Sequence, residues 1–250
     1  MRKLSPRSEV RNFALRAWNR MQGNLPIPPA ELIFLAAGSE DVSWFLKAGA
    51  WGAQSILDIL QKHGLSLADV SPILDFGCGC GRIMRHWKSL QEVELYGTDY
   101  NLRLINWCRV ELPFAHFQTN ELCGRLDYAD NKFGFIYALS VFTHLTEEQQ
   151  FFWIGELFRI LRPGGYLLIT VHGEHYLNIL PPQEQEQFRL GRLVILGEEY
   201  AGTNMCAAFH PEQYVREKLA RGWNVVDFIP EGARGNPSQD LFLLRKPTAS

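Results

Sequence analysis

The segment ILDFGCGCGR, residues 73–82, constrains the fold of this 250-residue chain more than any other. A short apolar run carries an acid, Asp75, and three glycines then alternate with other residues between Gly77 and Gly81. Such a run is typical of a strand buried on both faces of a parallel sheet. The glycines allow positive φ and let a ligand approach without an intervening Cβ. A helix-compatible segment begins at Arg82, and its first N–H groups would be free. We therefore predict a nucleotide-type ligand site at the mouth of a parallel sheet.

The spacing of the glycines discriminates between ligands. Gly77 and Gly79 fit the dinucleotide motif G-x-G-x-x-G, but the next glycine is Gly81 and position 82 is arginine. No Lys-Ser or Lys-Thr pair directly follows these glycines, as a P-loop requires. Asp75 would repel a pyrophosphate and suits a cation. The pattern D-x-G-x-G-x-G resembles the first motif of class I S-adenosylmethionine-dependent methyltransferases, whose cofactor has no phosphate and carries a sulfonium and an α-amino group. The alternative is a tight turn without a ligand, because glycine-rich turns are common.

A second acid stands where the next strand–helix unit should deliver one. The predicted strand Glu94–Thr98 ends in Asp99. In dinucleotide-binding folds an acid at this place binds the ribose hydroxyls, and the resemblance assigns Asp99 the same role on S-adenosylmethionine. Asp99 could also cap a helix over Asn101–Leu112, and the two roles are compatible.

The resemblance extends over roughly residues 73–171. Further strands are expected at Ala115–Gln118, Phe133–Ala138 and Tyr166–Val171, with a capped helix at Glu147–Leu161 and a turn at Arg162–Gly165 before the last of them. Asn120 stands where the family usually has an acid close to the adenine, and 139–145 matches the segment beside the sulfonium. The resemblance thus implies a cofactor site made of Asp75, Gly77, Cys78, Gly79, Gly81, Arg82, Asp99, Tyr100, Asn120, Glu121, Leu139 and Ser140.

The fold class that follows is α/β, with a Rossmann-like doubly wound sheet of seven strands whose last strand is antiparallel. Asn224–Ile229 and Leu241–Arg245 are the closing strands, preceded by a helix at Pro211–Arg221. We expect residues 1–66 to form an N-terminal helical cap and residues 67–250 the cofactor-binding domain. Within the latter, residues 172–209 are too long for an ordinary connection, and we interpret them as a substrate lid.

The N-terminal part contains several helical patterns. Apolar residues recur at helical spacing between Val10 and Met21, with arginines opposite them, and further helices are expected at Ala30–Ala36, Ser39–Lys47 and Gln54–His63. Three aromatic residues of this part could cover the cofactor or pack on the sheet: Trp44, Phe45 and Trp51.

Composition excludes some classes of function. The net charge of −2 gives no electrostatic case for nucleic acid. The first residues lack the apolar stretch of a signal peptide, and no apolar run approaches the ~18 residues of a membrane span. We therefore expect a cytoplasmic enzyme. The five cysteines show no disulfide framework, and Cys78 and Cys80 suit a tight turn better than a metal site, because no second ligand pair matches them.

Methyl transfer from a sulfonium is an in-line displacement that mainly requires alignment in a dry site. A hydroxyl acceptor would also need a base. His144 and His172 follow the fourth and fifth strands and are the candidates, with His175 and His210 weaker. We predict methylation of a small molecule: a sugar, a lipid precursor or a natural product. The alternatives are an RNA or protein methyltransferase and, less favoured, an NAD-dependent oxidoreductase. The sequence leaves the acceptor and the oligomeric state open.

Overall fold

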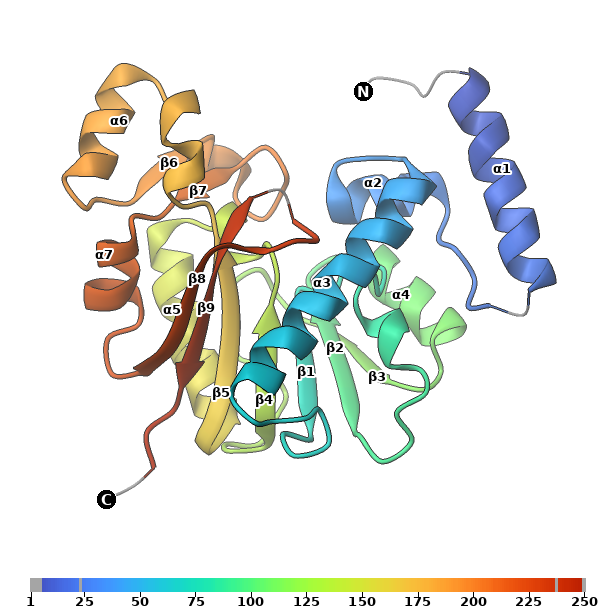
Figure 1. Cartoon of the computed structure of the whole chain (residues 1–250), viewed down its shortest axis with the longest axis horizontal. Helices are drawn as coiled ribbons and strands as arrows, with labels where there is room; N and C mark the ends of the chain where they lie inside the picture. Colours follow the sequence, from blue (N-terminus) through green and yellow to red (C-terminus); the bar gives the residue numbers. More distant parts are fainter. Residues whose placement is uncertain (1–5, 23, 237, 249–250) are drawn as a thin grey trace.

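A seven-stranded sheet organises the fold, with the strand order β3-β2-β1-β4-β5-β9-β8 (Figure 1). The structure is a computed structural model, and it describes residues 6–22, 24–236 and 238–248. Its strands are β1 (Ile73–Phe76), β2 (Leu95–Asp99), β3 (His116–Thr119), β4 (Phe133–Ala138), β5 (Leu161–Val171), β6 (Val194–Leu196), β7 (Ala207–Phe209), β8 (Asn224–Ala233) and β9 (Gln239–Arg245). Its α-helices are α1 (Pro6–Met21), α2 (Ala30–Ala37), α3 (Val42–Lys62), α4 (Leu102–Glu111), α5 (Glu147–Ile160), α6 (Pro182–Arg189) and α7 (Glu212–Tyr214), and short 3₁₀ or π turns complete the order at η1 (Met84–Trp87), η2 (Phe142–His144), η3 (Glu174–Ile179), η4 (Glu198–Tyr200) and η5 (Val215–Leu219).

The pairing of the strands confirms the predicted fold class. β1 pairs in parallel with β2 and β4, β2 with β3, and β4 with β5. β9 is antiparallel to both β5 and β8. The chain reverses its direction of winding between β1 and β4, which creates a topological switch point, and ligands of such sheets bind outside the carboxyl ends of the strands there.

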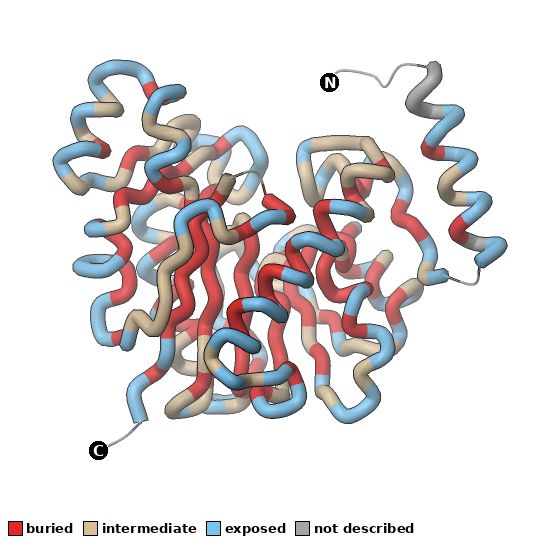
Figure 2. The backbone as a smooth tube through the Cα atoms, in the orientation of Figure 1, coloured by how far each residue is buried: buried red, intermediate tan, exposed pale blue. Residues whose placement is uncertain are grey.

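Helices cover both faces of the sheet, which explains why its central strands are continuously apolar. All residues of β1 and β4 are buried, and successive side chains face opposite layers. Ile73, Phe135 and Tyr137 pack with α3 and α4, whereas Leu74 and Ile136 pack with α5 and η5. Figure 2 shows the resulting buried centre.

Helix α3 corrects the expectation of two helices at Ser39–Lys47 and Gln54–His63, because one 21-residue helix spans both. Two glycines inside this helix allow close packing. A Cβ on Gly49 would lie 2.6 Å from the carbonyl oxygen of Arg82, and one on Gly52 would lie 2.6 Å from Ile83 Cδ1. The helix begins after Asp41, whose side chain accepts hydrogen bonds from two backbone N–H groups of the first turn.

The glycine turn is not followed by the expected α-helix at Arg82. The chain makes tight turns and then the short 3₁₀ helix η1. Met84 and Trp87 from η1 pack into the same apolar layer as α3 and α4. The predicted helix at Pro211–Arg221 is likewise divided, into α7 and the π turn η5. Other boundaries differ by a few residues.

The insertion after β5 is present and is a folded unit (upper left in Figure 1). β6 and β7 form a separate two-stranded antiparallel sheet. Four buried residues make its own small core: Leu180, Phe188, Val194 and Phe209. The division of the chain into a cap at 1–66 and a cofactor domain at 67–250 stays a prediction. Helix α3 belongs to the predicted cap by its residue range, yet it packs directly on the sheet of the cofactor domain. Within the described residues, no helix combines the length and apolar character that a membrane crossing requires.

Candidate active site

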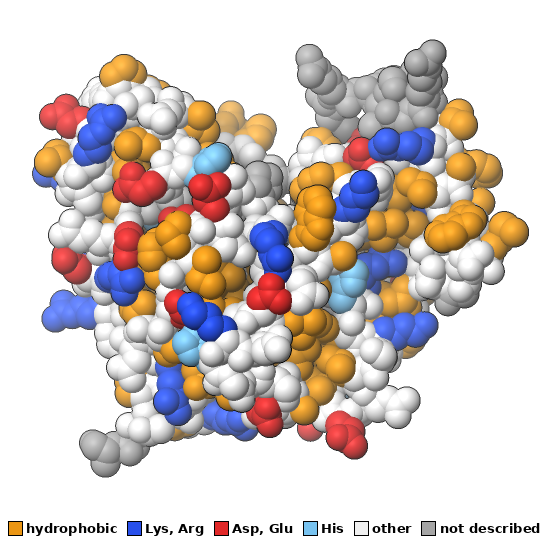
Figure 3. Space-filling view, viewed as in Figure 1, with side chains coloured by type: hydrophobic (Ala, Val, Ile, Leu, Met, Phe, Trp, Pro, Cys, Tyr) orange, Lys and Arg blue, Asp and Glu red, His pale blue; other side chains and the backbone are white. Residues whose placement is uncertain are grey.

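A cavity of about 330 Å³ lies at the carboxyl ends of the central strands. Its walls come from α2, the turns after β1, β2 and β4, the insertion and the loop before β9. In Figure 3 the surface is indented above the sheet, between the insertion and helices α2 and α3. All the predicted cofactor residues line the cavity except Gly81 and Glu121. Both leading histidines, His144 and His172, also line it.

The glycine turn needs all three of its glycines for backbone reasons. Gly77, Gly79 and Gly81 have φ values of +74°, +55° and +75°. A Cβ on Gly77 would lie 2.4 Å from Val141, and one on Gly81 would lie 2.3 Å from Leu112. The Cβ of a residue at position 79 would lie 2.9 Å from the Cβ of Ala36 in α2. The turn is therefore a contact surface for three other segments as well as a wall of the cavity.

Asp75 offers an acceptor without a donor. Its carboxylate is buried, and Oδ2 has no hydrogen-bond partner among the described atoms. Burial raises the pKa of Asp75 to about 8, although a hydrogen bond with Tyr137 and the charge of Arg82 both act to lower it. A buried, unpaired carboxylate is costly, so a cation in the cavity would stabilise its charged form.

A donor without an acceptor lies near the same end of the cavity. Asn236 is 3% exposed, and its Nδ2 has no hydrogen-bond partner among the described atoms. Its Oδ1 accepts from Arg82, whose other terminal nitrogen donates to the carbonyl of Gly235 at 2.8 Å. Burial lowers the pKa of Arg82 to about 10, so the guanidinium keeps its charge at neutral pH. This orphaned donor and acceptor, both close to the charge of Arg82, are complementary to the carboxylate and ammonium of an amino-acid group.

Asp99 is held in place by the backbone. Its Oδ2 accepts from the N–H of Gly79 at 2.9 Å, and its Oδ1 accepts from the N–H of Asn101 at 2.8 Å. Each carboxylate oxygen retains a further lone pair, so ribose hydroxyls could still donate to it. The cap of α4 is Asn101, which accepts from the N–H of Arg103. The capping role considered for Asp99 therefore belongs to its neighbour.

On the expected adenine side of the site, both polar groups of Asn120 make hydrogen bonds within the protein. Asn120 Oδ1 accepts from the hydroxyl of Thr98 at 2.7 Å, and its Nδ2 donates to the carbonyl of Glu121 at 2.6 Å. The side chain of Glu121 is exposed and does not line the cavity. Tyr100 and Leu104 line the cavity beside Asn120.

His144 and His172 both line the cavity, and their ring nitrogens differ in their hydrogen bonds. His144 Nδ1 lies 2.7 Å from the carbonyl oxygen of Cys206. Because a carbonyl can only accept, Nδ1 carries the proton and Nε2 keeps its lone pair. Burial lowers the pKa of His144, so the ring is neutral at physiological pH. The rings of His144 and His172 are 6.4 Å apart.

One ring nitrogen of His172 is already engaged. Its Nε2 lies 3.3 Å from the amide nitrogen of Gln239, whereas its Nδ1 is buried without a hydrogen-bond partner among the described atoms. The oxygen of the same amide accepts from Thr170 at 2.7 Å, and its nitrogen donates to Ser140 at 2.8 Å. Burial, followed by the neighbouring His144, lowers the pKa of His172 to about 4. His175 and His210, the weaker candidates, do not line the cavity.

Several wall residues come from segments that carry no recognisable motif. Asn236 lies just before β9, Gln239 is the first residue of β9, and Tyr176 and Asn204 belong to the insertion. Trp44 also lines the cavity, whereas Phe45 is buried in the cap and Trp51 is 53% exposed. Only long-range pairing brings these segments to the glycine turn, so no local signal predicted their place.

The C-x-C pair of the turn is explained by its packing. The thiol of Cys80 is directed to the carbonyl of Leu32, and that of Cys78 to the carbonyl of Gly79. Across the described ranges, no group of three or more His, Cys, Asp or Glu side chains is placed to hold a metal ion.

Comparisons with known proteins agree with this geometry. Residues 74–169 match a family model described as a methyltransferase domain. Phosphoethanolamine N-methyltransferase 3 from Arabidopsis thaliana is 27% identical over 121 residues, which are 44% of this chain and 23% of that protein. The chain spans about a quarter of the length of the curated relatives it matches.

Solved structures show the same fold. A SAM-dependent methyltransferase from Methanosarcina mazei superposes with a TM-score of 0.58 and 22% identity, covering 76% of this chain and 98% of that one. The glycopeptide N-methyltransferase MtfA superposes with a TM-score of 0.56 and 16% identity, covering 78% of this chain and 90% of its own.

Proposed function

We propose, from the premise that residues 74–169 are a class I S-adenosylmethionine-dependent methyltransferase domain, that the protein methylates a small, uncharged acceptor through an oxygen atom. The proposal rests on a single cavity that contains two sets of groups. The first is the glycine turn with the unpartnered Asp75 Oδ2 and Asn236 Nδ2, and the second is the neutral His144, whose Nε2 has a free lone pair.

The residues present fit the cofactor. Asp75 Oδ2 and Asn236 Nδ2, both without partners among the described atoms, suit the α-ammonium and α-carboxylate of its methionine part. Asp99 is anchored to accept from the ribose hydroxyls. When bound, the cofactor would supply an already activated methyl group, so the protein's task is to orient the acceptor and exclude water.

His144 is better placed than His172 to act as the base. Its Nδ1 proton is fixed by the Cys206 carbonyl, which leaves Nε2 to accept a proton from an acceptor hydroxyl. The Nε2 of His172 instead lies 3.3 Å from the amide nitrogen of Gln239. We therefore assign general-base catalysis to His144, and His172 would contact the acceptor as a neutral ring.

The cavity disfavours an acceptor with a phosphate. Among its lining residues in the described part of the chain, Arg82 is the sole lysine or arginine, and its guanidinium is bound to Gly235 and Asn236. Both lining histidines are neutral because burial lowers their pKa values. The phosphate in the name of the curated relatives would thus find no free cation here. Polymeric RNA is disfavoured on the same ground.

Calorimetry tests the cofactor assignment. We expect the protein to bind S-adenosylhomocysteine and not NAD. Asp75→Asn and Asp99→Ala should each weaken binding about 10- to 100-fold, since charge-assisted hydrogen bonds contribute ~1.5–3 kcal/mol. Glu121→Gln is the matched control and should bind as the native protein does. Binding of NAD, or equal losses in all three variants, would contradict the proposal.

Transfer of a labelled methyl group tests the acceptor. A panel of alcohols, phenols, amines and phosphorylated amines should give products on hydroxyl groups. His144→Gln should reduce turnover at least 100-fold with unchanged cofactor affinity, because general-base catalysis contributes ~10²–10⁴-fold. His172→Gln should mainly raise KM for the acceptor. Methylated phosphoethanolamine as the main product would overturn the assignment of acceptor class.

A further inference from the structure

Six residues that line the cavity come from η2, from the position directly after it and from the insertion. They are His144, Leu145, His172, Tyr176, Gly202 and Asn204, and we call them the acceptor wall. None of the six is an acid, a lysine or an arginine, and burial lowers the pKa values of both histidines, so their rings are neutral. The acceptor wall is therefore uncharged at physiological pH and suits a neutral acceptor.

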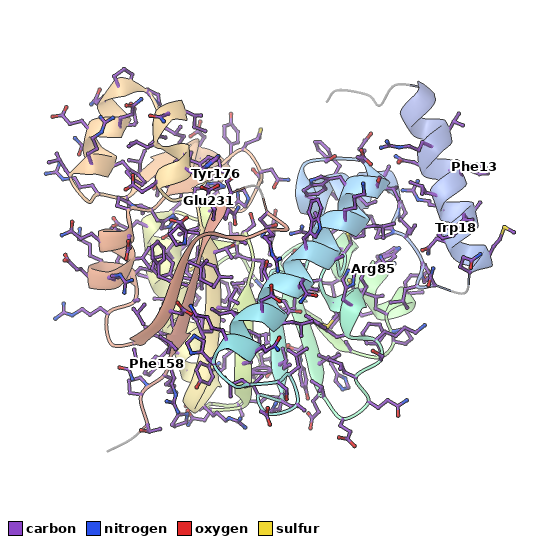
Figure 4. The ribbon with its side chains drawn as sticks, in the orientation of Figure 1. Phe13, Trp18, Arg85, Phe158, Tyr176 and Glu231 are labelled. Atoms are coloured by element: carbon purple, nitrogen blue, oxygen red, sulfur yellow. The ribbon has the colours of Figure 1, made fainter. Side chains whose placement is uncertain are left out.

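Three side chains of the acceptor wall present rings. The ring centroid of His172 lies 6.4 Å from that of His144 and 4.5 Å from that of Tyr176. Tyr176 also lies 5.3 Å from the ring of His175, whose Nδ1 pairs with Glu231 at 3.0 Å. Figure 4 shows Tyr176 beside Glu231, above the ends of the central strands. Neighbours on several sides hold these rings in place, and rings fixed in this way offer flat apolar surfaces for a further aromatic ring.

Two polar side chains that also line the cavity, Ser140 and Gln239, are already engaged inside the protein. The amide of Gln239 contacts the hydroxyls of Thr170 at 2.7 Å and Ser140 at 2.8 Å, and its nitrogen lies 3.3 Å from His172 Nε2. The backbone N–H of Ser140 donates to Thr170 at 2.8 Å. A sugar would bring several hydroxyls out of water, and each unpaired hydroxyl would be costly. A single hydroxyl on an aromatic ring needs one partner, which His144 Nε2 supplies.

The base in the cavity restricts the acidity of the acceptor. Burial lowers the pKa of His144 below the ordinary ~6.5, so its Nε2 is a weak base. A phenolic hydroxyl has a pKa of ~10, whereas water, which aliphatic alcohols resemble in acidity, has ~15.7. Arg82, the sole lysine or arginine among the described lining residues, is bonded to Gly235 and Asn236, so it is not free to stabilise an alkoxide. A phenol spreads the developing charge over its own ring and does not need such a cation.

We propose that the acceptor is a phenol whose ring packs against Tyr176 and His172 and whose hydroxyl lies at His144 Nε2. This inference rests on the transfer to oxygen proposed above and narrows it to hydroxyl groups on aromatic rings. In the step, the acceptor oxygen forms a bond to the methyl carbon as the bond between that carbon and the cofactor sulfur breaks, and the sulfur keeps the electron pair. The hydroxyl proton passes to His144 Nε2 and from there to solvent, and the product is a methyl aryl ether.

Rates of labelled-methyl transfer to matched acceptors test the inference. Phenol and cyclohexanol share the ring size and a single hydroxyl, and aniline and a methyl glucoside complete the set. We expect kcat/KM for phenol to exceed that for cyclohexanol and for the glucoside about 100-fold or more, because proton transfer to His144 favours the more acidic hydroxyl. Equal rates for phenol and cyclohexanol would overturn the phenol assignment and leave transfer to oxygen intact. Aniline as the best acceptor would overturn both, and so would a set without any product.

Variants of the acceptor wall test where the ring binds. Tyr176→Leu should raise KM for phenol about three- to tenfold with kcat and S-adenosylhomocysteine affinity nearly unchanged, whereas Tyr176→Phe, which keeps the ring, should behave as the native protein does. Tyr200→Leu, at an insertion tyrosine that does not line the cavity, is the matched control. His144→Gln should slow transfer to phenol far more than transfer to a nitrophenol, whose hydroxyl is acidic enough to lose its proton to water. An unchanged KM in Tyr176→Leu, or equal losses for the two phenols in His144→Gln, would overturn the proposed binding mode.

Discussion

At the scale of single residues, the charge state of Asp75 links stability to the cofactor. Its folded-state pKa of about 8 lies above the ordinary value of ~3.9, because burial favours the neutral form. Between these values the unfolded chain loses its proton while the folded chain keeps it. The contribution of neutral Asp75 to stability is therefore complete below pH ~4 and is lost as the pH rises to about 8.

Asp75→Asn should accordingly stabilise the protein without cofactor, with little effect near pH 4 and a gain that grows toward pH 8. At ~1.36 kcal/mol per pKa unit, the gain is at most on the order of 5 kcal/mol, which corresponds to a rise of at most about 10–20 °C in Tm. Thermal unfolding at pH 5, 7 and 8.5 checks this. S-adenosylhomocysteine should raise Tm of the native protein and have a much smaller effect on the variant. A variant less stable than the native protein at pH 8.5 would contradict this account.

The glycine turn gives a second prediction at this scale. Gly79→Ala would place a Cβ 2.9 Å from that of Ala36, so the substitution should displace α2 rather than block the cavity directly. Whether the new Cβ displaces α2 or blocks the cavity, the positive φ of 55° at position 79 also costs about 1 kcal/mol of stability when the residue is alanine. We expect weaker binding of S-adenosylhomocysteine by calorimetry and partial recovery when Ala36→Gly is added. No recovery in the double variant would indicate that the added Cβ acts on the ligand.

At the scale of whole elements, two glycines of α3 should differ in how far the same substitution changes Tm. Alanine at either site gains ~1 kcal/mol of helix propensity. At Gly49 the new Cβ meets the backbone oxygen of Arg82 at 2.6 Å, which cannot move without disturbing the glycine turn. At Gly52 it meets the end of the Ile83 side chain, which can rotate. Gly49→Ala should lower Tm by several degrees, and Gly52→Ala should leave it within ~2 °C. Equal changes of Tm in the two variants would contradict the prediction that the backbone contact at Gly49 is costlier than the side-chain contact at Gly52.

The same elements show what the sequence could and could not predict. Buried apolar runs predicted β1, β2 and β4, because two covered faces demand continuous apolar runs, and Asp75 and Asp99 marked the first two. The sequence predicted two helices where the structure has the single helix α3. Asn236 and Gln239 were not predicted, because their place depends on how the last two strands fold back across the sheet. The insertion was predicted from its length, while its own core depends on pairing between β6 and β7.

At the scale of the whole molecule, the cavity joins three parts of the chain that are distant in sequence. Arg82 connects the glycine turn to Gly235 and Asn236, and the amide of Asn204 donates to the carbonyl of Phe34 at 3.5 Å, connecting the insertion to α2. A ligand that satisfies Asp75 and Asn236 would therefore restrain segments far beyond its own contacts.

Hydrogen exchange with and without S-adenosylhomocysteine tests this coupling. At 100-fold excess over Kd, binding adds ~2.7 kcal/mol to global stability. Slower exchange should appear at 34–38, 77–82 and 234–236, because local opening of any of these segments would expose the ligand site. The helix α6 does not line the cavity and packs on the insertion's own core, so its exchange should change least. In Asn236→Ala, which keeps Asp75 and the glycine turn, protection should persist at 77–82 and fall at 234–236. Protection confined to 77–82 in the native protein would show that the ligand binds the turn without closing the molecule around it.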